Sequence, residues 1–384
     1  MNPFGKRRRQ FLGQAARTAM GVTALSSVPA ELTANQITGK PLRVGVVIEP
    51  TGAHLDPFLS SLADCEGIDQ IAIADETGGT FEKAKGFLAK RFGTIRTFSN
   101  DQEMISSFKP EFMLISLEAH HSPGPVERAL NAGCHVLAEK PACIRQQDFE
   151  KLAALALSRK RYLMLALANR LTPPAQKARE LVQAGYLGKL YGTNLFMLAD
   201  QTRLTRLKYQ QSWRSFKAKM GGGHLIWLGI HWLDLVQFIS GDQVRQVCGF
   251  TRNVGGQPIE VEDAAVLALQ FNSGMVGSMQ SGYYLDSGYQ TLLTIWGSQG
   301  WLRFDLIGGK PLEWYSTHPD APRGNQSFSY QLESRDYFPM VQRSINCARG
   351  TEKPWLTETE GLHVLKVIFG LYRAAETGKT QTIA

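Results

Sequence analysis

Two histidines, a tryptophan and an aspartate lie at helical spacing within residues 222–239, where they could support acid–base chemistry. His224, Trp227 and His231 are three and four residues apart, so they can share one face of a helix. Histidine suits proton transfer because its ordinary pKa, about 6.5, lies close to neutral pH. Asp234, one turn after His231, either orients the imidazole or only supports the helix. The alternative is that His231 is only a packed, hydrogen-bonded core residue.

A lysine in the sequence Glu139-Lys140-Pro141 is the second group that could do chemistry. It follows the apolar run at 134–138, which places it at the carboxyl end of an expected parallel strand, the edge where ligands bind. An ammonium there can stabilise the negative charge that develops on an alcohol oxygen during oxidation. The alternative is a solvated surface charge, but Pro141 stiffens the turn, and this favours the functional interpretation.

These residues need a framework, and the chain alternates strand and helix patterns from residue 42 onward. The expected strands are 42–48, 70–75, 111–117 and 134–138, and the expected helices are 53–64, 79–92 and 123–132. This rhythm predicts an α/β domain over 42–165 with a doubly wound parallel sheet. Its functional loops should follow the strands, at 48–54, 75–79, 117–123 and 139–143.

A second pattern begins near residue 188, where longer alternating runs are separated by Gly, Asn and Ser. It predicts a C-terminal α+β domain over 166–384 with an open, mostly antiparallel sheet. One face of such a sheet must be covered, either by helices at 172–185 and 222–239 or by another subunit. The final expected helices are 333–349 and 358–376.

The first thirty residues have the layout of an export signal. They contain five basic residues and no acid, then a mildly apolar middle and a small-residue end at Val28-Pro29-Ala30. Arg8 and Arg9, followed by Gln10-Phe11-Leu12, resemble the twin-arginine signal that carries folded proteins across the bacterial inner membrane. The alternative is a basic amphipathic arm. With export, the mature chain begins after a cleavage site near residue 30, followed by a linker over 31–41, and works in the periplasm or outside the cell.

Composition excludes several other classes of protein. The chain has 384 residues, 43% apolar and 20% charged, which is enough for two globular domains and too mixed for a disordered or fibrous protein. No run approaches the roughly 18 uncharged apolar residues of a membrane span. Five cysteines without a C-x-x-C pair indicate neither a disulfide framework nor a metal site. Most of the net charge of +8 falls on the first thirty residues, so no nucleic-acid surface is expected.

Three stretches together resemble a known family. They are NAGCHVLAEKPAC at 131–143, ANRLTPPAQKARELVQAGYLGKL at 168–190 and WRSFKAKMGGGHLIWLGIHWLDLV at 213–236. They resemble the family of glucose-fructose oxidoreductase and inositol dehydrogenase, Gfo/Idh/MocA, over nearly all of residues 42–384. The resemblance includes the C-terminal helix, which in the family returns to the first domain. The resemblance implies an N-terminal Rossmann domain that holds NAD or NADP. It also implies a C-terminal domain that carries a polyol or sugar site.

The resemblance also implies roles for single residues. Glu139 and Lys140 match the family's Glu-Lys-Pro element, in which the lysine lies beside the nicotinamide and the substrate hydroxyl. His231 matches the family's proton-transfer residue. Arg170 and Arg214 match positions near the cleft, where each either binds a substrate hydroxyl or carboxylate or forms a surface ion pair.

The phosphate loop departs from the family's pattern. Ile48, Pro50 and Ala53 stand at the positions where G-x-G-x-x-G is usual, and Glu49 would repel phosphate if it pointed inward. Backbone N–H groups at the helix start could still meet a pyrophosphate. The expected cofactor-binding residues of this loop are Thr51, Gly52, Ala53 and His54.

Asp75 follows about 20 residues later, at the end of the second strand. It either binds the ribose hydroxyls, which favours NAD over NADP, or caps the next turn. Further cofactor contacts are expected after the later strands, from Glu118, His120, Glu139 and Lys140.

The segment around His231 also departs from the family's pattern. Relatives commonly carry aspartate four residues before the histidine, whereas this chain has Trp227, which cannot transfer a proton but can stack on a sugar. His224 is the expected replacement for the lost acid; otherwise the change marks a different reaction. Glu118, His120 and His121 replace a more usual polar-proline loop near the nicotinamide, and they add titratable groups without an assigned catalytic role. The expected substrate-binding residues are Arg170, Arg214, Trp227 and Asp234.

The expected function is an exported oxidoreductase that acts on a sugar, polyol or glycoside hydroxyl. Outside the cytoplasm no pool of free coenzyme recycles NAD, so the protein is expected to hold the cofactor tightly. The alternatives are an NAD-dependent, redox-neutral glycoside hydrolase and a non-catalytic sugar-binding or scaffold protein that has lost the dinucleotide. The expected partners are the twin-arginine export machinery and a second copy of the chain, paired through the C-terminal sheet.

Overall fold

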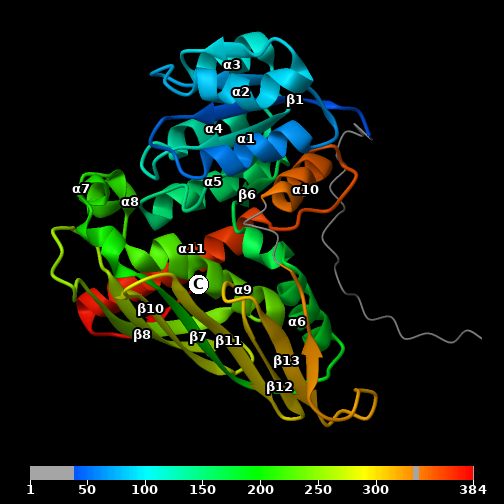
Figure 1. Ribbon diagram of the computed structural model, residues 1–384, viewed down its shortest axis with the longest axis vertical. Coiled ribbons are helices and arrows are strands. Elements are labelled where there is room, and N and C mark those ends of the chain that lie inside the picture. The colour runs from blue at the N-terminus through cyan, green and yellow to red at the C-terminus, as the bar shows by residue number, and fades with distance from the viewer. Residues whose placement is uncertain (1–38, 332–336, 384) are drawn as a thin grey trace, which may run out of the picture. The chain divides into compact units, whose positions relative to one another are not determined.

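The computed structural model describes residues 39–331 and 337–383 (Figure 1). The expected signal peptide at 1–30 and most of the expected linker at 31–41 lie outside these residues. No helix within the described ranges is long and apolar enough to cross a membrane.

The N-terminal sheet has six parallel strands in the order β3-β2-β1-β4-β5-β6. The strand order reverses between β1 and β4, which is the switch point where doubly wound sheets bind ligands. The strands are β1 Leu42–Ile48, β2 Ile68–Ala74, β3 Arg96–Phe98, β4 Phe112–Ser116, β5 His135–Ala138 and β6 Leu163–Leu165. The helices between them are α1 Leu55–Asp64, α2 Phe81–Phe92, α3 Asp101–Phe108, α4 Pro123–Asn131 and α5 Gln146–Arg159.

Burial explains why these strands form. Every residue of β4 is buried, and so are the last five of β1, which fits the near-continuous apolar runs of a parallel sheet covered on both faces. The expected doubly wound fold is therefore confirmed. Strands β3 and β6 and helices α3 and α5 have no counterpart among the expected elements. Both strands have only three residues, which is too short for a clear apolar pattern.

The C-terminal sheet has nine strands in the order β14-β13-β12-β11-β7-β10-β9-β8-β15, and all neighbours are antiparallel except β7 and β10. The expected open, mostly antiparallel sheet is confirmed. Its longer strands are β7 Leu190–Asp200, β8 Val244–Arg252, β9 Ala264–Phe271, β10 Val276–Leu285 and β11 Tyr289–Gly297. The shorter ones are β12 Gly300–Asp305, β13 Lys310–Ser316, β14 Gln326–Phe328 and β15 Gln381–Thr382.

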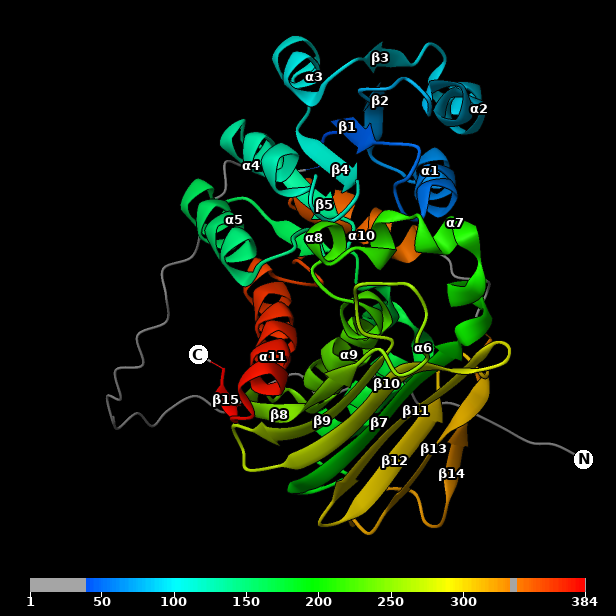
Figure 2. The same cartoon turned by 90° about the vertical axis from the view of Figure 1, so that its left-hand side faces the viewer.

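Helices cover one face of this sheet (Figures 1 and 2). They are α6 Pro173–Gln183, α9 Ile230–Ser240 and α11 Glu358–Thr377. Along β9 the buried residues alternate with exposed ones, as expected for a sheet with one covered face. The other face exposes large apolar side chains from four strands, namely Phe250, Val266, Val276 and Trp296.

Two helices from the end of the chain connect the sheets. Helix α10, Phe338–Ala348, packs against α1, while α11 packs against both α5 of the first sheet and β8 of the second. The helix α11 begins with a capping box in which Thr357 and Glu360 satisfy each other's backbone N–H groups.

Short helical turns fill the chain between β7 and α9. They are η2 Gln201–Thr205, α7 Leu207–Gln210, η3 Trp213–Ser215, α8 Lys217–Met220 and the π-helical turn η4 Leu225–Gly229. The triple glycine before η4 is explained by close packing: a Cβ at Gly222 would collide with the Tyr372 hydroxyl, and one at Gly223 with the Glu262 carbonyl.

Candidate active site

A cavity of about 860 Å³ is lined by residues that lie near the N-terminal sheet and by residues that lie near the C-terminal sheet. Lys140 and His54 reach it from the carboxyl edge of the N-terminal sheet, from the loops after β5 and β1. Trp227 and His231 reach it from η4 and the first turn of α9. The structure therefore brings together the lysine and the histidine that the sequence analysis singled out, from segments about 90 residues apart.

Lys140 is a buried ammonium, with only 2% of the residue exposed. Its Nζ donates a hydrogen bond to the Trp227 carbonyl oxygen at 2.5 Å and lies 3.2 Å from the centroid of the Trp227 ring. The solvated-charge alternative is therefore wrong. A cation in such a water-poor place acts strongly on charge that develops nearby.

The indole of Trp227 is enclosed by protein groups. Besides Lys140, it has the His54 ring stacked at 5.8 Å and the Trp213 ring edge-on at 5.8 Å, and the guanidinium of Arg214 lies 4.7 Å from its centroid. Only 9% of Trp227 is exposed, so the open ring face expected for stacking on a sugar is largely covered.

His224 does not share the face of Trp227 and His231, and the expectation that it replaces a catalytic acid is corrected here. It is fully buried outside the cavity lining, where its Nδ1 lies 2.7 Å from Ser281 Oγ and its ring packs edge-on against Tyr283. Burial lowers its pKa to about 3, so it stays neutral. The physical reason is the π turn η4, whose wider winding rotates His224 away from an α-helical register.

Arg170 and Asp234 also lie outside the cavity lining, and their expected substrate-binding role is corrected. The Arg170 guanidinium binds both carboxylate oxygens of Asp234, at 2.7–2.9 Å, and a second carboxylate, Glu360. Both partners of the first pair are at most 2% exposed. This buried ion pair fixes α9 against η1, Ala168–Leu171, and α11, and it thereby positions His231.

The loop after β1 is held tightly. The Gly52 N–H donates to the Glu49 carbonyl at 2.9 Å, so it closes a turn instead of facing a phosphate as expected. The Thr51 and Ala53 carbonyls accept from Trp213 Nε1 and Ser116 Oγ. A Cβ at Gly52 would lie 2.5 Å from the Ser116 carbonyl, which explains why glycine stands there.

His54 ends this loop as the N-cap residue of α1, in a left-handed conformation at φ 55°. Its Nδ1 lies 3.1 Å from a carboxylate oxygen of Glu139, whose other oxygen is buried without a hydrogen-bond partner among the described residues. The helix has no side-chain cap, which leaves the backbone N–H groups of Leu55 and Asp56 to meet an anion. Pro57 has no N–H, Phe58 donates to the His54 carbonyl, and the Asp56 carboxylate is a negative charge in the same turn.

Glu49 points inward and bridges the switch point. One carboxylate oxygen accepts the Glu118 backbone N–H at 2.5 Å, and the other lies 3.0 Å from His121 Nδ1. The bridge joins the loop after β1 to the loop after β4, across the crevice in which doubly wound sheets bind dinucleotides. It places a negative charge there, the arrangement identified from sequence as repulsive to phosphate.

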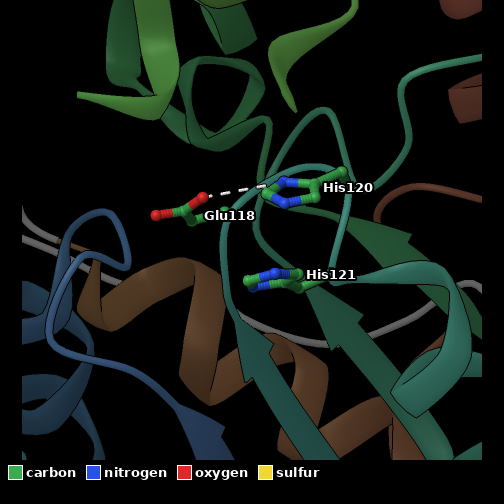
Figure 3. A group of neighbouring side chains, drawn as sticks. All are labelled: Glu118, His120 and His121. Carbon is green, nitrogen blue, oxygen red and sulfur yellow. Dashed lines mark ion pairs between the residues drawn. The ribbon is translucent and has the colours of Figure 1, made fainter. Parts of the chain in front are cut away.

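Glu118, His120 and His121 form a compact group beside this bridge (Figure 3). Each offers one ligand atom, and these atoms lie within 4.8 Å of one another. Two imidazoles and a carboxylate form a donor set that Zn²⁺ accepts, although no metal site was expected from the sequence. In the structure His121 Nδ1 is already engaged by Glu49. Burial, followed by the neighbouring His121, lowers the pKa of His120.

Asp75 takes the capping role that the sequence analysis held open. Its two carboxylate oxygens accept the backbone N–H and hydroxyl groups of Thr77 and Thr80, at 2.7–2.9 Å. Burial raises its pKa, but the four hydrogen bonds outweigh burial and leave the pKa below its ordinary value. Its oxygens are thus committed to the turn before α2.

Some cavity residues were not identified from the sequence. Arg203 and Arg206 lie in or beside η2, and Tyr209 and Tyr289 come from α7 and β11. The only available signal was the basic and aromatic run RLTRLKYQ at 203–210. Arg214, which was expected near substrate, does line the cavity.

Comparison with known proteins assigns the chain to one family. Residues 44–167 match the oxidoreductase family with an NAD-binding Rossmann fold, and residues 175–303 match the GFO/IDH/MocA C-terminal domain. D-glucoside 3-dehydrogenase of Escherichia coli K12 is 23% identical over 368 residues, covering 89% of this chain and 97% of its own.

Solved structures share the fold. The WlbA dehydrogenase of Bordetella pertussis, in complex with NADH and UDP-GlcNAcA, has a TM-score of 0.75 and 20% identity, covering 90% of this chain and 99% of its own. A levoglucosan dehydrogenase, in complex with NADH and L-sorbose, has a TM-score of 0.78 and 17% identity with the same coverage.

The N-terminal domain is an NAD-binding Rossmann domain, and its residues fit the cofactor at two places. The uncapped start of α1 suits the pyrophosphate, while Lys140 and the unpartnered Glu139 oxygen lie where the nicotinamide end is expected. Glu49 is the residue that opposes cofactor binding, because its hydrogen bond to the Glu118 backbone crosses the same crevice.

Glu49→Gln is expected to tighten NAD binding. The amide removes the negative charge at the switch point, and its oxygen can still accept the Glu118 N–H. We expect the Kd for NAD to fall about three- to tenfold, or ~0.7–1.4 kcal/mol. Isothermal titration of NAD into wild-type and variant protein measures this, with Glu127→Gln, an exposed glutamate on α4, as the control. Unchanged or weaker binding by the variant would show that Glu49 does not oppose the cofactor.

Proposed function

Because the chain belongs to the GFO/IDH/MocA family of oxidoreductases, we propose that it oxidises or reduces a carbohydrate at a hydroxyl-bearing carbon. The substrate is a sugar, polyol or glycoside, and NAD is the cofactor. The observation that carries this proposal is the meeting of Lys140 and His231 on one cavity from two separate parts of the fold.

The two residues divide the work of alcohol oxidation. When NAD is bound, it supplies the acceptor for the hydride that leaves the substrate carbon. His231 takes the proton of the same hydroxyl, and in the reverse direction returns it. The Lys140 ammonium holds the oxygen and stabilises its developing negative charge. The Arg170–Asp234 pair keeps α9, and with it His231, in place.

Relatives support the carbohydrate class of substrate. The Escherichia coli relative is named for oxidation of a glucoside, and the two solved structures hold a nucleotide sugar acid and L-sorbose. The cavity volume of about 860 Å³ is also in the range of small-molecule sites.

Lys140→Met and His231→Gln are each expected to reduce turnover at least about 100-fold, because each removes one of the two acting groups. The assay follows product formation from a panel of sugars and glycosides with NAD supplied. Lys208→Met, an exposed lysine outside the cavity lining, is the matched control, and circular dichroism checks folding. Full activity in the folded Lys140→Met variant would remove the lysine from the reaction.

An assay for coenzyme in the purified wild-type protein distinguishes the oxidoreductase from the hydrolase and from a non-catalytic binding or scaffold protein. Wild-type protein is denatured, and the supernatant is assayed for NAD(H). Bound or bindable coenzyme supports the oxidoreductase. Glycoside cleavage without net change of the coenzyme would indicate the redox-neutral hydrolase, and failure to bind NAD or NADP would indicate a binding or scaffold protein.

The protein is further proposed to act in the periplasm or outside the cell, exported by the twin-arginine machinery. Arg8 and Arg9 in their basic, then apolar setting support this. Changing both to lysine is expected to keep the protein in the cytoplasm, because that machinery reads the arginine pair. Cell fractionation with an antibody measures the distribution. Undiminished export of the double variant would exclude this route.

The protein is also proposed to pair with a second copy through the open face of the C-terminal sheet. Val276 and Trp296 flank Gly192 in neighbouring register positions and are 57% and 44% exposed, and Phe250 pairs with Val266 further across. Large exposed apolar side chains on one face of a sheet indicate an interface.

Val276→Arg is expected to shift the protein from dimer to monomer, because it places an unpaired charge within the contact. Light scattering after size-exclusion chromatography measures the mass. Leu157→Arg, at another exposed apolar residue on α5, is the control. A monomeric wild type would contradict the proposal.

A further inference from the structure

Three arginines line the cavity from one short stretch of chain after β7. Arg203 lies in η2, Arg206 directly follows it, and Arg214 lies in η3. The proposed oxidation of a neutral hydroxyl uses Lys140 and His231 and needs no further cation. These three charges therefore require another explanation.

None of the three has a carboxylate partner among the residues that the structure describes, in contrast to paired arginines such as Arg170 and Arg303. Within the described ranges, Arg203 donates to two neutral oxygens, the Asp200 backbone carbonyl at 3.0 Å and the Tyr289 hydroxyl at 3.3 Å. No described residue therefore cancels the charge of the three arginines by a direct ion pair.

Arg214 is a cation that is partly removed from water. Its guanidinium is partly buried between the rings of Trp213 and Trp227, each with its centroid 4.7 Å away. Burial lowers its pKa, and Tyr209 and the more distant Glu139 and Glu118 carboxylates only partly compensate. A desolvated cation without a direct ion pair is unfavourable, and an anionic ligand would recover part of that free energy.

Tyr209 lies within electrostatic reach of two of the arginines, Arg203 and Arg214. Its hydroxyl is 3.4 Å from that of Tyr283, and the Arg203 guanidinium lies 5.3 Å from the centroid of the Tyr283 ring. Burial raises the pKa of Tyr209, whereas Arg214 and Arg203 both lower it, which places the two guanidiniums within electrostatic reach of one phenol. The two arginines thus act on the same part of the cavity.

The charge of the described lining is strongly one-sided. Asp200 is its one acid, against Lys140 and the three arginines. The Asp200 carboxylate already accepts the Thr202 N–H at 2.7 Å. A cavity with mainly one sign of charge concentrates ligands of the opposite sign.

We propose that the substrate is an acidic carbohydrate whose carboxylate or phosphate is held by Arg203, Arg206 and Arg214. A hydroxyl of the same molecule then meets Lys140 and His231, a placement that rests on the proposed function. Guanidinium suits this task because its planar fork matches carboxylate and phosphate oxygens. Charge selection itself is a property of binding and is tested without turnover.

The test is isothermal titration of the full chain with D-glucose, D-glucuronate and D-glucose 6-phosphate, with and without NAD. Glucuronate and glucose differ only in the carboxylate, and the phosphate arm distinguishes the two oxyanions. We expect one or both acids to bind at least about tenfold more tightly than glucose. We also expect this preference to weaken as salt is raised.

Arg214→Gln is expected to remove about tenfold or more of the preference, and Arg214→Lys to retain part of it. Since Arg214 packs on two tryptophans, Arg206→Gln is a second variant at an exposed side chain, expected to lose severalfold affinity for the acid alone. Arg245→Gln, exposed on β8, is the matched control and should change nothing.

The outcomes separate this inference from the proposed function. Equal or tighter binding of glucose, no binding of either acid, or full preference in folded Arg214→Gln and Arg206→Gln would overturn it. Turnover of neutral sugars without acid preference would leave the oxidoreductase standing and remove the inference. Acid preference in a protein that binds no NAD and shows no turnover would support the anion site and contradict the oxidoreductase function.

Discussion

The contact between the Lys140 ammonium and Trp227 joins the two halves of the site. Burying an ammonium is expensive unless it gains a hydrogen bond and a favourable electrostatic environment, and Trp227 supplies both, through its carbonyl oxygen and its ring. The carbonyl belongs to the π turn before α9, while the lysine follows β5. The position of the reactive groups therefore depends on the local winding of one helical turn, which π turns at functional sites often provide.

The framework of the site could be predicted from the sequence, because apolar periodicity reports burial directly. The runs around β1, β4 and β5 gave the parallel sheet, and the edge that presents Lys140 followed from it. The π turn could not be predicted, since η4 contains ordinary apolar residues. An α-helical register applied to His224 therefore gave the wrong face. Similarly, the carboxylate partners of Arg170, Asp234 and Glu360, are distant from it in sequence, so no local pattern reports them.

The carboxyl edge of the first sheet shows how a family scaffold can be altered at its most constrained position. Ile48, Pro50 and Ala53 stand where glycines are usual, the Glu49 carboxylate ties the loops after β1 and β4 together, and Asp75 is committed to its own turn. The domain thus keeps the topology of a dinucleotide site with different polar groups facing it. The start of α1 and the nicotinamide end remain the expected places of cofactor contact, since the usual glycines are absent and the acid is engaged elsewhere.

The long terminal helix has a mechanical consequence. Because α11 packs against α5 of one sheet and β8 of the other, and α10 packs against α1, the lobes are strapped together by continuous chain. A rotation that separates the N-terminal domain from the C-terminal domain would break the packing of these helices. Entry and exit of ligands should consequently proceed by rearrangement of side chains and short turns around the cavity mouth, so throughput would be governed by small, rapid motions.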